Sequence, residues 1–249
     1  MKKVIVFDLD GTLAESKQAI DPEMSVLLAE LLYVREIGIV SGDGIMHIQQ
    51  AVIDKLPFDA ESFKKLYLLP TKGAGMYVFN GTEWIKLYEE RLTKEDKERI
   101  RDAFEKITKE VDFLPKEHFG DVLEDRETQF TFSALGQNAP TELKREWDKD
   151  FAKRQTLKAL LEKYIPEFAI EIGGTTSIDI TKKNVDKGFA LEQLCKYKNI
   201  PIADIMFVGD RLFPGGNDYA VTRTGVDTIA VNDYNETKDI IRKIINNEI

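Results

Sequence analysis

At both ends of the chain, runs of consecutive apolar residues alternate with segments in which apolar residues recur at helical spacing. Runs of consecutive apolar residues are typical of strands that are buried on both faces of a parallel sheet. Such runs occupy residues 3–7, 37–40, 205–208 and 228–231. Between the first two runs, leucines recur at helical spacing after an Asp21-Pro22 pair that suits a helix start. This alternation predicts a doubly wound, Rossmann-like α/β domain with a parallel sheet.

The pattern changes in the middle of the chain. Strand-like segments at 76–79 and 84–88 flank Asn80-Gly81, which predicts a hairpin with a type I′ turn. Thr93 suits the start of a charged helix, and residues 141–164 have a helical pattern. The other strand-like segments are 129–135, 168–172 and 177–180, the last two separated by Gly173-Gly174.

The change of pattern predicts two domains. We expect an α/β core made of residues 1–82 and 184–249, interrupted by an α+β insert at residues 83–183. An insert of this length is near the usual size of a domain.

Composition narrows the possible partners. Acidic residues outnumber basic ones, 44 to 35, which gives a formal net charge of −9. Nonspecific nucleic-acid binding needs a basic surface, so this balance argues against a nucleic-acid partner. No apolar run is long enough to span a membrane, so no membrane partner is expected either. Cys195 is the only cysteine, which fits a reducing compartment and a soluble, cytoplasmic protein.

Acidic and small polar residues follow three of the predicted strands. Asp8 and Asp10 follow the first, Ser41-Gly42-Asp43 follows the second, and Asp210 follows the strand at 205–208. Ligands of open parallel sheets bind beyond the carboxyl ends of the strands, so these side chains are expected to lie close together. Lys187 begins a predicted helix and can reach the same edge.

This set of residues suits phosphoryl transfer. Carboxylates are ligands that Mg²⁺ prefers, and Asp8, Asp210 and Asp218 are candidates to hold one ion. A carboxylate can attack phosphorus, and a second one two residues later can act as acid and base. A lysine, a hydroxyl and exposed amides can offset the charge of the phosphoryl group. Each feature alone is also common in ordinary turns and solvated surfaces, so the argument depends on the whole set.

The motifs resemble those of the haloacid dehalogenase superfamily. The segment DLDGTL at 8–13 resembles its first motif, and Ser41, Lys187 and Gly209-Asp210 resemble the next three in order. The insert between the second and third motifs is similar to a C2-type cap domain. The closest similarity is to the eukaryotic-type phosphomannomutase branch, through residues 20–22, 37–43, 173–179 and 209–218.

The resemblance implies roles for the core residues. Asp8 would be the nucleophile and Asp10 the general acid and base. Asp8, Asp210 and the carbonyl of Asp10 would hold Mg²⁺, with Asp218 orienting Lys187 or completing the metal shell. The residues implied to bind the phosphoryl group or orient its lysine are Ser41, Gly42, Lys187 and Asn217.

The resemblance is weaker where the branch binds the second phosphate of its substrate. Arg126 matches an expected arginine, whereas Gln137 and Lys17 stand where arginines are expected. Arginine binds phosphate through a planar fork that lysine lacks, and glutamine brings no charge. Ser177 and Asp179 match a pair that binds sugar hydroxyls.

We therefore expect an enzyme that acts on a phosphorylated sugar. A sugar-phosphate phosphatase is favoured, because water as acceptor does not require the second phosphate to be held. The alternatives are a phosphomannomutase that interconverts mannose 1-phosphate and mannose 6-phosphate, and a noncatalytic protein that binds a phosphometabolite. The related mutases also suggest a homodimer formed through the cap.

Overall fold

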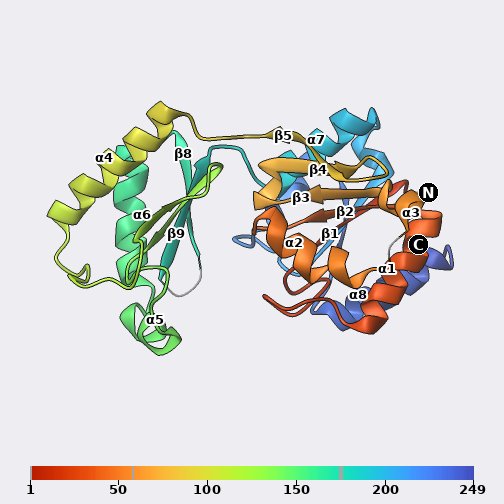
Figure 1. Ribbon diagram of the computed structural model, residues 1–249, viewed down its shortest axis with the longest axis horizontal. Helices are drawn as coiled ribbons and strands as arrows, with labels where there is room; N and C mark the ends of the chain where they lie inside the picture. Colours follow the sequence, from red (N-terminus) through yellow and green to blue (C-terminus); the bar gives the residue numbers. More distant parts are fainter. Residues whose placement is uncertain (1, 58, 174–175) are drawn as a thin grey trace. The chain divides into compact units, whose positions relative to one another are not determined.

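The computed structural model describes residues 2–57, 59–173 and 176–249, and the chain forms two compact units. The core unit comprises Met1–Glu89 and Val185–Ile249, and the insert unit comprises Glu90–Asn184. Figure 1 shows the helices and strands of each unit. Gly174, expected beside Gly173 between two strands, lies outside the described residues.

A seven-stranded sheet forms the centre of the core unit, in the order β11-β10-β1-β2-β3-β4-β5. Its first five strands are parallel, and β4 and β5 form an antiparallel hairpin at one edge. The expected doubly wound α/β fold is confirmed. The strands are β1 (Val4–Asp8), β2 (Glu36–Val40), β3 (Leu66–Leu69), β4 (Gly75–Phe79), β5 (Trp84–Glu89), β10 (Ile205–Gly209) and β11 (Asp227–Ala230).

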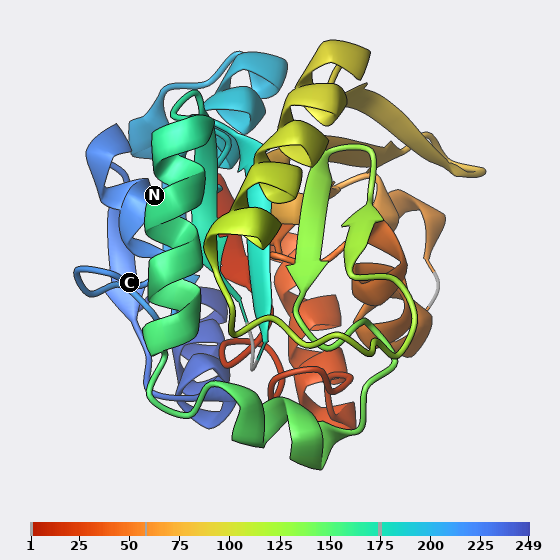
Figure 2. The same cartoon turned by 90° about the vertical axis from the view of Figure 1, so that its left-hand side faces the viewer.

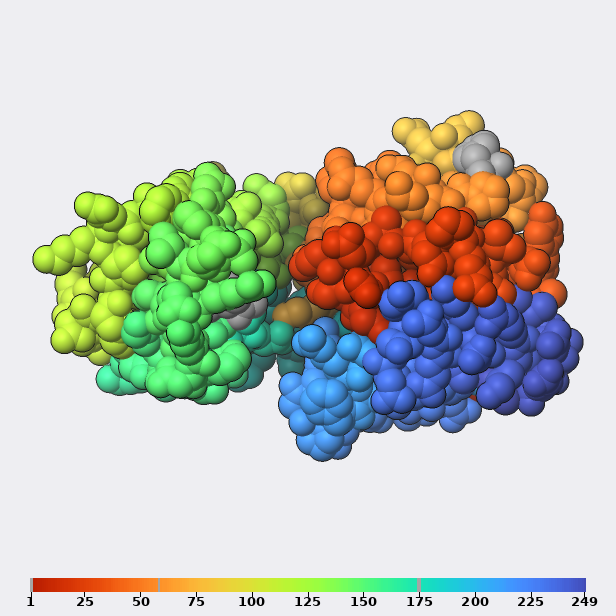
Figure 3. All heavy atoms as spheres, turned by 90° about the horizontal axis from the view of Figure 1, so that it is seen from below, coloured from red at the N-terminus to blue at the C-terminus, as the bar shows by residue number. Residues whose placement is uncertain are grey.

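Helices cover both faces of this sheet, which explains the continuous apolar runs. Successive strand residues point to opposite faces. Ile5 and Phe7 of β1 pack in one apolar cluster with α1, α2 and α8, whereas Val4 and Val6 pack in another with α7. Figure 3 shows the N-terminal segment beside the C-terminal one, where α1 contacts α8. The helices are α1 (Pro22–Val34), α2 (Ile45–Ala51), α7 (Lys187–Lys198) and α8 (Tyr234–Ile245).

Short helical segments fill several connections of the core unit. They are α3 (Ala60–Phe63) and the 3₁₀ helices η1 (Ile53–Lys55), η2 (Thr71–Gly73), η3 (Ile202–Asp204) and η4 (Tyr219–Thr224). Within the described residues, none of the helices of either unit combines the length and the apolar character needed to cross a membrane.

The insert unit is a four-stranded antiparallel sheet with helices on one face. The strand order is β6-β7-β9-β8, and α4 and α6 lie side by side over the sheet (Figure 2). Phe130 and Phe132 of β7 face these helices, whereas Gln129 and Thr131 alternate with them and face the opposite side. The elements are α4 (Lys94–Glu110), β6 (Leu123–Asp125), β7 (Gln129–Ser133), α5 (Thr141–Trp147), α6 (Ala152–Tyr164), β8 (Phe168–Ile172) and β9 (Ser177–Lys182).

The hairpin formed by β4 and β5 differs from the prediction in two ways. It pairs with β3 in the core sheet, so the core unit extends to Glu89 instead of ending at residue 82. Its loop spans the four residues 80–83, and the side-chain oxygen of Asn80 accepts hydrogen bonds from the amides of Thr82 and Glu83. The prediction of a two-residue type I′ turn was therefore wrong.

Residues 141–164 are helical as predicted, except for a break between α5 and α6. Phe151 has a left-handed backbone with φ of 64°. The carboxylate of Asp148 accepts hydrogen bonds from the amides of Lys153 and Arg154, which caps the start of α6. By contrast, Thr93 caps α4 as predicted, in a reciprocal capping box with Asp96.

Asp148 and Arg154 form a buried ion pair in the insert unit. Arg154 Nε lies 2.6 Å from Asp148 Oδ2, and the two residues are only 1% and 4% exposed. The guanidinium also donates to the carbonyl of Gly173 at 3.2 Å. A buried ion pair stabilises a fold only when its hydrogen bonds are satisfied, and this one joins the start of α6 to the end of β8.

Arg154→Met is expected to lower the free energy of unfolding by about 3 kcal/mol, because it leaves the Asp148 carboxylate buried without its partner. Urea denaturation followed by circular dichroism measures this change. Lys149→Met is the control, since the ion pair of Lys149 with Glu146 is 65% exposed on both sides. It should change stability by less than about 0.5 kcal/mol. Equal effects of the two substitutions would contradict the assignment.

Candidate active site

Three carboxylates meet at the carboxyl edge of the core sheet. Asp8 ends β1, Asp210 follows β10, and Asp218 precedes η4. One oxygen from each lies within 4.8 Å of the others. Because β1 and β10 are parallel neighbours, their carboxyl ends bring Asp8 and Asp210 to the same place, as the sequence predicted.

Lys187 lies between two of these carboxylates. It is the first residue of α7, whose start is fixed by a hydrogen bond from the amide of Phe189 to Asp186. Lys187 Nζ is 2.5 Å from Asp8 Oδ1 and 2.5 Å from Asp218 Oδ1, and its side chain is fully buried. The second oxygen of Asp218 accepts from the amide of Arg211 at 2.9 Å. Asp218 therefore orients Lys187.

Burial and charge shift the pKa values of this centre. Burial, helped by Asp218, raises the pKa of Asp8 to about 7, against the attraction of Lys187. Burial and the Asp218 charge also raise the pKa of Asp210 above its ordinary value. For Lys187, burial lowers the pKa, but Asp8 and Asp218 outweigh it and the net shift is upward. The surroundings therefore disfavour the ionised form of Asp8 and Asp210, whereas Lys187 stays protonated.

The residues of this centre fit a divalent cation. When all three carboxylates are ionised, as ligands of a cation must be, one ammonium leaves an excess of two negative charges. Asp210 Oδ1 is buried and has no hydrogen-bond partner among the described residues. Buried carboxylate oxygens without donors are costly, and hard cations such as Mg²⁺ take oxygen ligands.

The turn after β1 packs directly against Asp210. Gly11 has φ of +89°, and a Cβ atom there would lie 2.4 Å from Asp210 Oδ2. A side chain at this position would be strained and would displace the carboxylate. Gly11 therefore lets the DLDGTL turn approach the acidic centre.

The second predicted strand end contributes Ser41, which is fully buried. Ser41 follows β2, and β2 pairs with β1 so that Val40 lies opposite Asp8. The Ser41 hydroxyl accepts from the amide of Asp43 at 3.1 Å, and Gly42 is exposed. Asn217 is exposed as well, and the described residues show no hydrogen bond between it and Lys187. Its expected role beside Lys187 stays a prediction.

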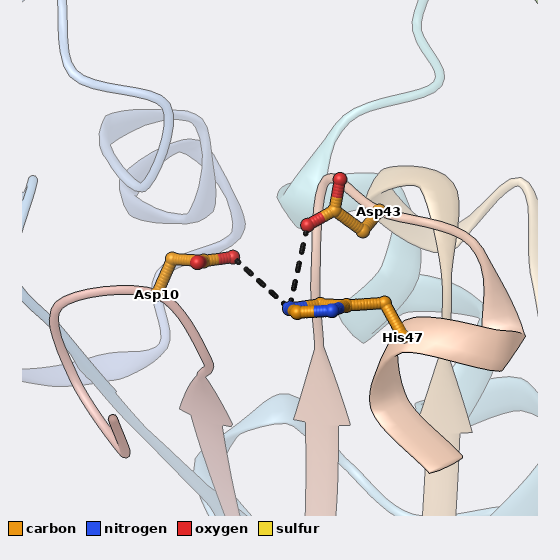
Figure 4. A group of neighbouring side chains, drawn as sticks. All are labelled: Asp10, Asp43 and His47. Carbon is orange, nitrogen blue, oxygen red and sulfur yellow. Dashed lines mark ion pairs between the residues drawn. The ribbon is translucent and has the colours of Figure 1, made fainter. Parts of the chain in front are cut away.

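The Asp10 carboxylate lies in a second cluster, with Asp43 and His47 (Figure 4). His47 Nε2 is 4.0 Å from Asp10 Oδ2 and 3.6 Å from Asp43 Oδ2. Lys17 donates its amide to Asp10 Oδ1 at 2.5 Å and pairs its ammonium with Asp43. Sequence reasoning assigned no role to His47. Its spacing of four residues from Asp43, at the start of a helix, was the available signal.

The candidate substrate residues of the insert unit lie on or near its polar sheet face. Ser177 and Asp179 are two residues apart on β9, so both side chains lie on that face. There, Asp179 Oδ1 accepts a hydrogen bond from the Thr131 hydroxyl at 2.9 Å. The Arg126 guanidinium donates two hydrogen bonds to Glu124, at 3.0 and 2.7 Å. The side-chain nitrogen of Gln137 is buried and has no hydrogen-bond partner in the part of the chain described.

The fold and this centre define an α/β enzyme with a buried aspartate–lysine pair at the carboxyl edge of its sheet. The chain belongs to the haloacid dehalogenase-like hydrolase family, whose model matches residues 5–221. Membership favours an enzyme over the noncatalytic binding protein considered as an alternative.

Known proteins are similar to this chain over most of its length. A probable phosphomannomutase of Caenorhabditis elegans is 28% identical over 235 residues, which cover 88% of this chain and 86% of that protein. Among solved structures, the IMP-nucleotidase of Plasmodium falciparum has a TM-score of 0.68 at 18% identity, covering 98% and 68% of the two chains. The trehalose-6-phosphate phosphatase of Aspergillus fumigatus has a TM-score of 0.62 at 15% identity, and the match covers 98% of this chain and 93% of that chain.

Gly11→Ala is expected to destabilise the protein more than Gly215→Ala. Both glycines have positive φ, which costs a side chain about 1 kcal/mol. A Cβ at Gly215 meets no atom within 4 Å, whereas at Gly11 it overlaps Asp210 and adds about 2 kcal/mol. Chemical denaturation of both variants measures the difference. Equal losses would mean that the turn does not pack against Asp210.

Proposed function

We propose that the protein is a Mg²⁺-dependent phosphatase of sugar phosphates that forms an aspartyl-phosphate on Asp8. The observation that carries the proposal is the position of Asp8. Its carboxylate is buried at the end of β1, 2.5 Å from Lys187, and Asp210 and Asp218 lie beside it. Family membership supports the same chemistry.

In the first step a carboxylate oxygen of Asp8 attacks phosphorus. The new bond from Asp8 to phosphorus forms as the bond from phosphorus to the sugar oxygen breaks. The leaving oxygen takes a proton from the Asp10 carboxyl group. Lys187 and the amides near Gly42 offset the negative charge of the phosphoryl group.

In the second step water attacks the phosphorus of the aspartyl-phosphate. A bond from the water oxygen to phosphorus forms as the bond from phosphorus to Asp8 breaks. Asp10, now ionised, accepts the proton that the water loses. Inorganic phosphate leaves, and both aspartates return to their starting states.

The metal belongs to the acidic centre. Asp8 and Asp210 would hold Mg²⁺, together with the Asp10 carbonyl, while Asp218 orients Lys187. The free Asp210 oxygen and the excess of negative charge support this assignment. When bound, Mg²⁺ supplies positive charge that lets an anionic phosphate approach three carboxylates.

The residues of the insert unit favour water over a sugar hydroxyl as the acceptor of the phosphoryl group. A mutase must hold the second phosphate of its sugar, and arginine is best suited to that task. Here the Arg126 guanidinium is hydrogen-bonded to Glu124, and the position of Gln137 carries no charge. This combination supports a phosphatase.

A phosphomannomutase is the second candidate. The similarity to the Caenorhabditis elegans protein covers 88% of this chain, insert included. Ser177 and Asp179 share one sheet face and are able to bind sugar hydroxyls in either activity. Lys17 and Gln137 would then be tolerated replacements of phosphate-binding arginines.

The proposal includes a phosphorylated sugar as the partner and a cytoplasmic location, which the single cysteine supports. The homodimer through the insert stays a prediction. Analytical ultracentrifugation of the full chain measures it directly.

Incubation with mannose 1-phosphate, Mg²⁺ and a trace of hexose bisphosphate separates the two activities. We expect free phosphate to accumulate while mannose 6-phosphate stays low, because water is the proposed acceptor. Phosphate and mannose 6-phosphate are followed together. Mannose 6-phosphate without phosphate would replace the phosphatase by the mutase. Other sugar phosphates follow if mannose 1-phosphate is inert.

Asp8→Asn is the control for the covalent step, and it should keep the fold and abolish turnover of every substrate. Asp10→Asn should still form the aspartyl-phosphate from a substrate with a good leaving group, but turn it over slowly. Activity retained without the Asp8 carboxylate would contradict the mechanism.

Mg²⁺ is expected to raise the melting temperature, by about 5 °C at saturation, because it binds the folded acidic centre and not the unfolded chain. Asp210→Asn should raise the melting temperature without metal, since it removes one of the repelling carboxylates, and should abolish most of the Mg²⁺ effect. Glu30→Gln makes the same charge change at an exposed site on α1 and should respond to Mg²⁺ like the wild type. An unchanged response of Asp210→Asn would contradict the metal assignment.

A further inference from the structure

His47 faces two carboxylates without making a hydrogen bond to either. Its Nε2 atom is enclosed, and the structure gives it no hydrogen-bond partner among the described residues. The atom points between Asp10 and Asp43, which come from the loops after β1 and β2 (Figure 4). The mechanism above uses Asp10 but not His47.

The two oxygens of the Asp10 carboxylate have different neighbours. Its Oδ1 accepts from the Lys17 amide at 2.5 Å, and its Oδ2 faces His47 Nε2. Lys17 has a left-handed backbone, with φ of 63°, and this conformation occurs where its amide reaches Asp10. The Asp10 side chain is 25% exposed, so it would otherwise be free to change rotamer.

Asp43 is close enough to Asp10 for the position of His47 between them to affect the Asp10 carboxylate. One oxygen of Asp43 lies within 4.8 Å of one of Asp10, close enough for two ionised carboxylates to repel. His47 Nε2 lies near both oxygens, and the Lys17 ammonium pairs with Asp43 from outside. Two facing carboxylates favour the tautomer that carries the proton on Nε2. Removing the imidazole would leave Asp10 free to turn away from Asp43.

The Nε2 atom of His47 is enclosed and faces the two carboxylates, so this atom is not open to a substrate. A cation bound by Asp10, Asp43 and His47 is disfavoured, since the Lys17 ammonium already pairs with Asp43. The cluster is therefore best explained by its effect on Asp10.

We propose that His47 is a positioning residue that, with Lys17, holds the Asp10 carboxyl group in the orientation for proton transfer to the leaving oxygen. This inference rests on the proposed function, in which Asp10 is the acid. Proton transfer requires the donor within hydrogen-bond reach of the leaving oxygen, so a rotated carboxyl group slows the step.

The test compares two substrates with different leaving groups. His47→Leu should lower kcat about 10-fold or more for a sugar phosphate, whose alkoxide must be protonated, and leave KM nearly unchanged. For p-nitrophenyl phosphate, whose leaving group needs little protonation, kcat should change less than about 3-fold. His47→Gln places an amide nitrogen near the position of Nε2 and should restore most of the loss. His118→Leu, at the exposed second histidine, is the matched control and should match the wild type.

A double mutant separates positioning from a structural effect. In an Asp10→Asn background, His47→Leu should cause no further loss with the sugar phosphate, because both act through one group. Additive losses, or equal losses with both substrates, would overturn the inference. If the wild type is active and depends on Asp8 but His47→Leu is silent, the inference fails while the proposed function stands.

A second measurement does not depend on turnover. Long-range ¹H–¹⁵N spectra should show the His47 imidazole as the Nε2–H tautomer, and Asp10→Asn should shift its Nε2 resonance. If the wild type hydrolyses neither substrate, the proposed function fails, and these spectra still decide whether His47 contacts Asp10. A His47 resonance that does not change on Asp10→Asn would overturn the contact.

Discussion

The buried ammonium of Lys187 holds the acidic edge of the core sheet together. It contacts Asp8 from the first strand and Asp218 from the turn before η4, and Asp218 in turn accepts from the backbone that follows Asp210. Three distant parts of the sequence thus converge on one positive charge. In a buried setting this charge counts for far more than in water, and without it the carboxylates would repel one another.

One ammonium does not balance three carboxylates when all of them are ionised, and the proposed cation would offset this deficit of positive charge. Burial is the main cause of the raised pKa values of Asp8 and Asp210, and the charge of Asp218 adds to it. In the proposed function a divalent cation would supply the missing charge, and the cation and the lysine together would attract the phosphate of a substrate. Gly11 matters for the same centre, since a side chain there would displace the Asp210 carboxylate.

The parts of the site that could be predicted are those fixed by local sequence. Apolar runs identify β1, β2 and β10 as buried strands, and the polar residues after them must lie at one edge of a parallel sheet. The place of the β4–β5 hairpin could not be predicted, because pairing with β3 is a nonlocal contact with no local signal. The break at Phe151 was hidden in the same way, since the buried Asp148–Arg154 pair that stabilises it involves the distant Gly173.

His47 shows most clearly why composition and spacing were insufficient. A histidine near the start of a helix is usually a partly buried surface residue, and only the fold brings it to Asp10, from a different loop. In the proposed mechanism the Asp8 carboxylate, which contacts Lys187, is the nucleophile, whereas Asp10 must give and accept a proton. It is therefore held by an amide and faced by an imidazole instead of being tied to a buried lysine. The two aspartates of one short motif thus differ in their partners as their proposed roles require.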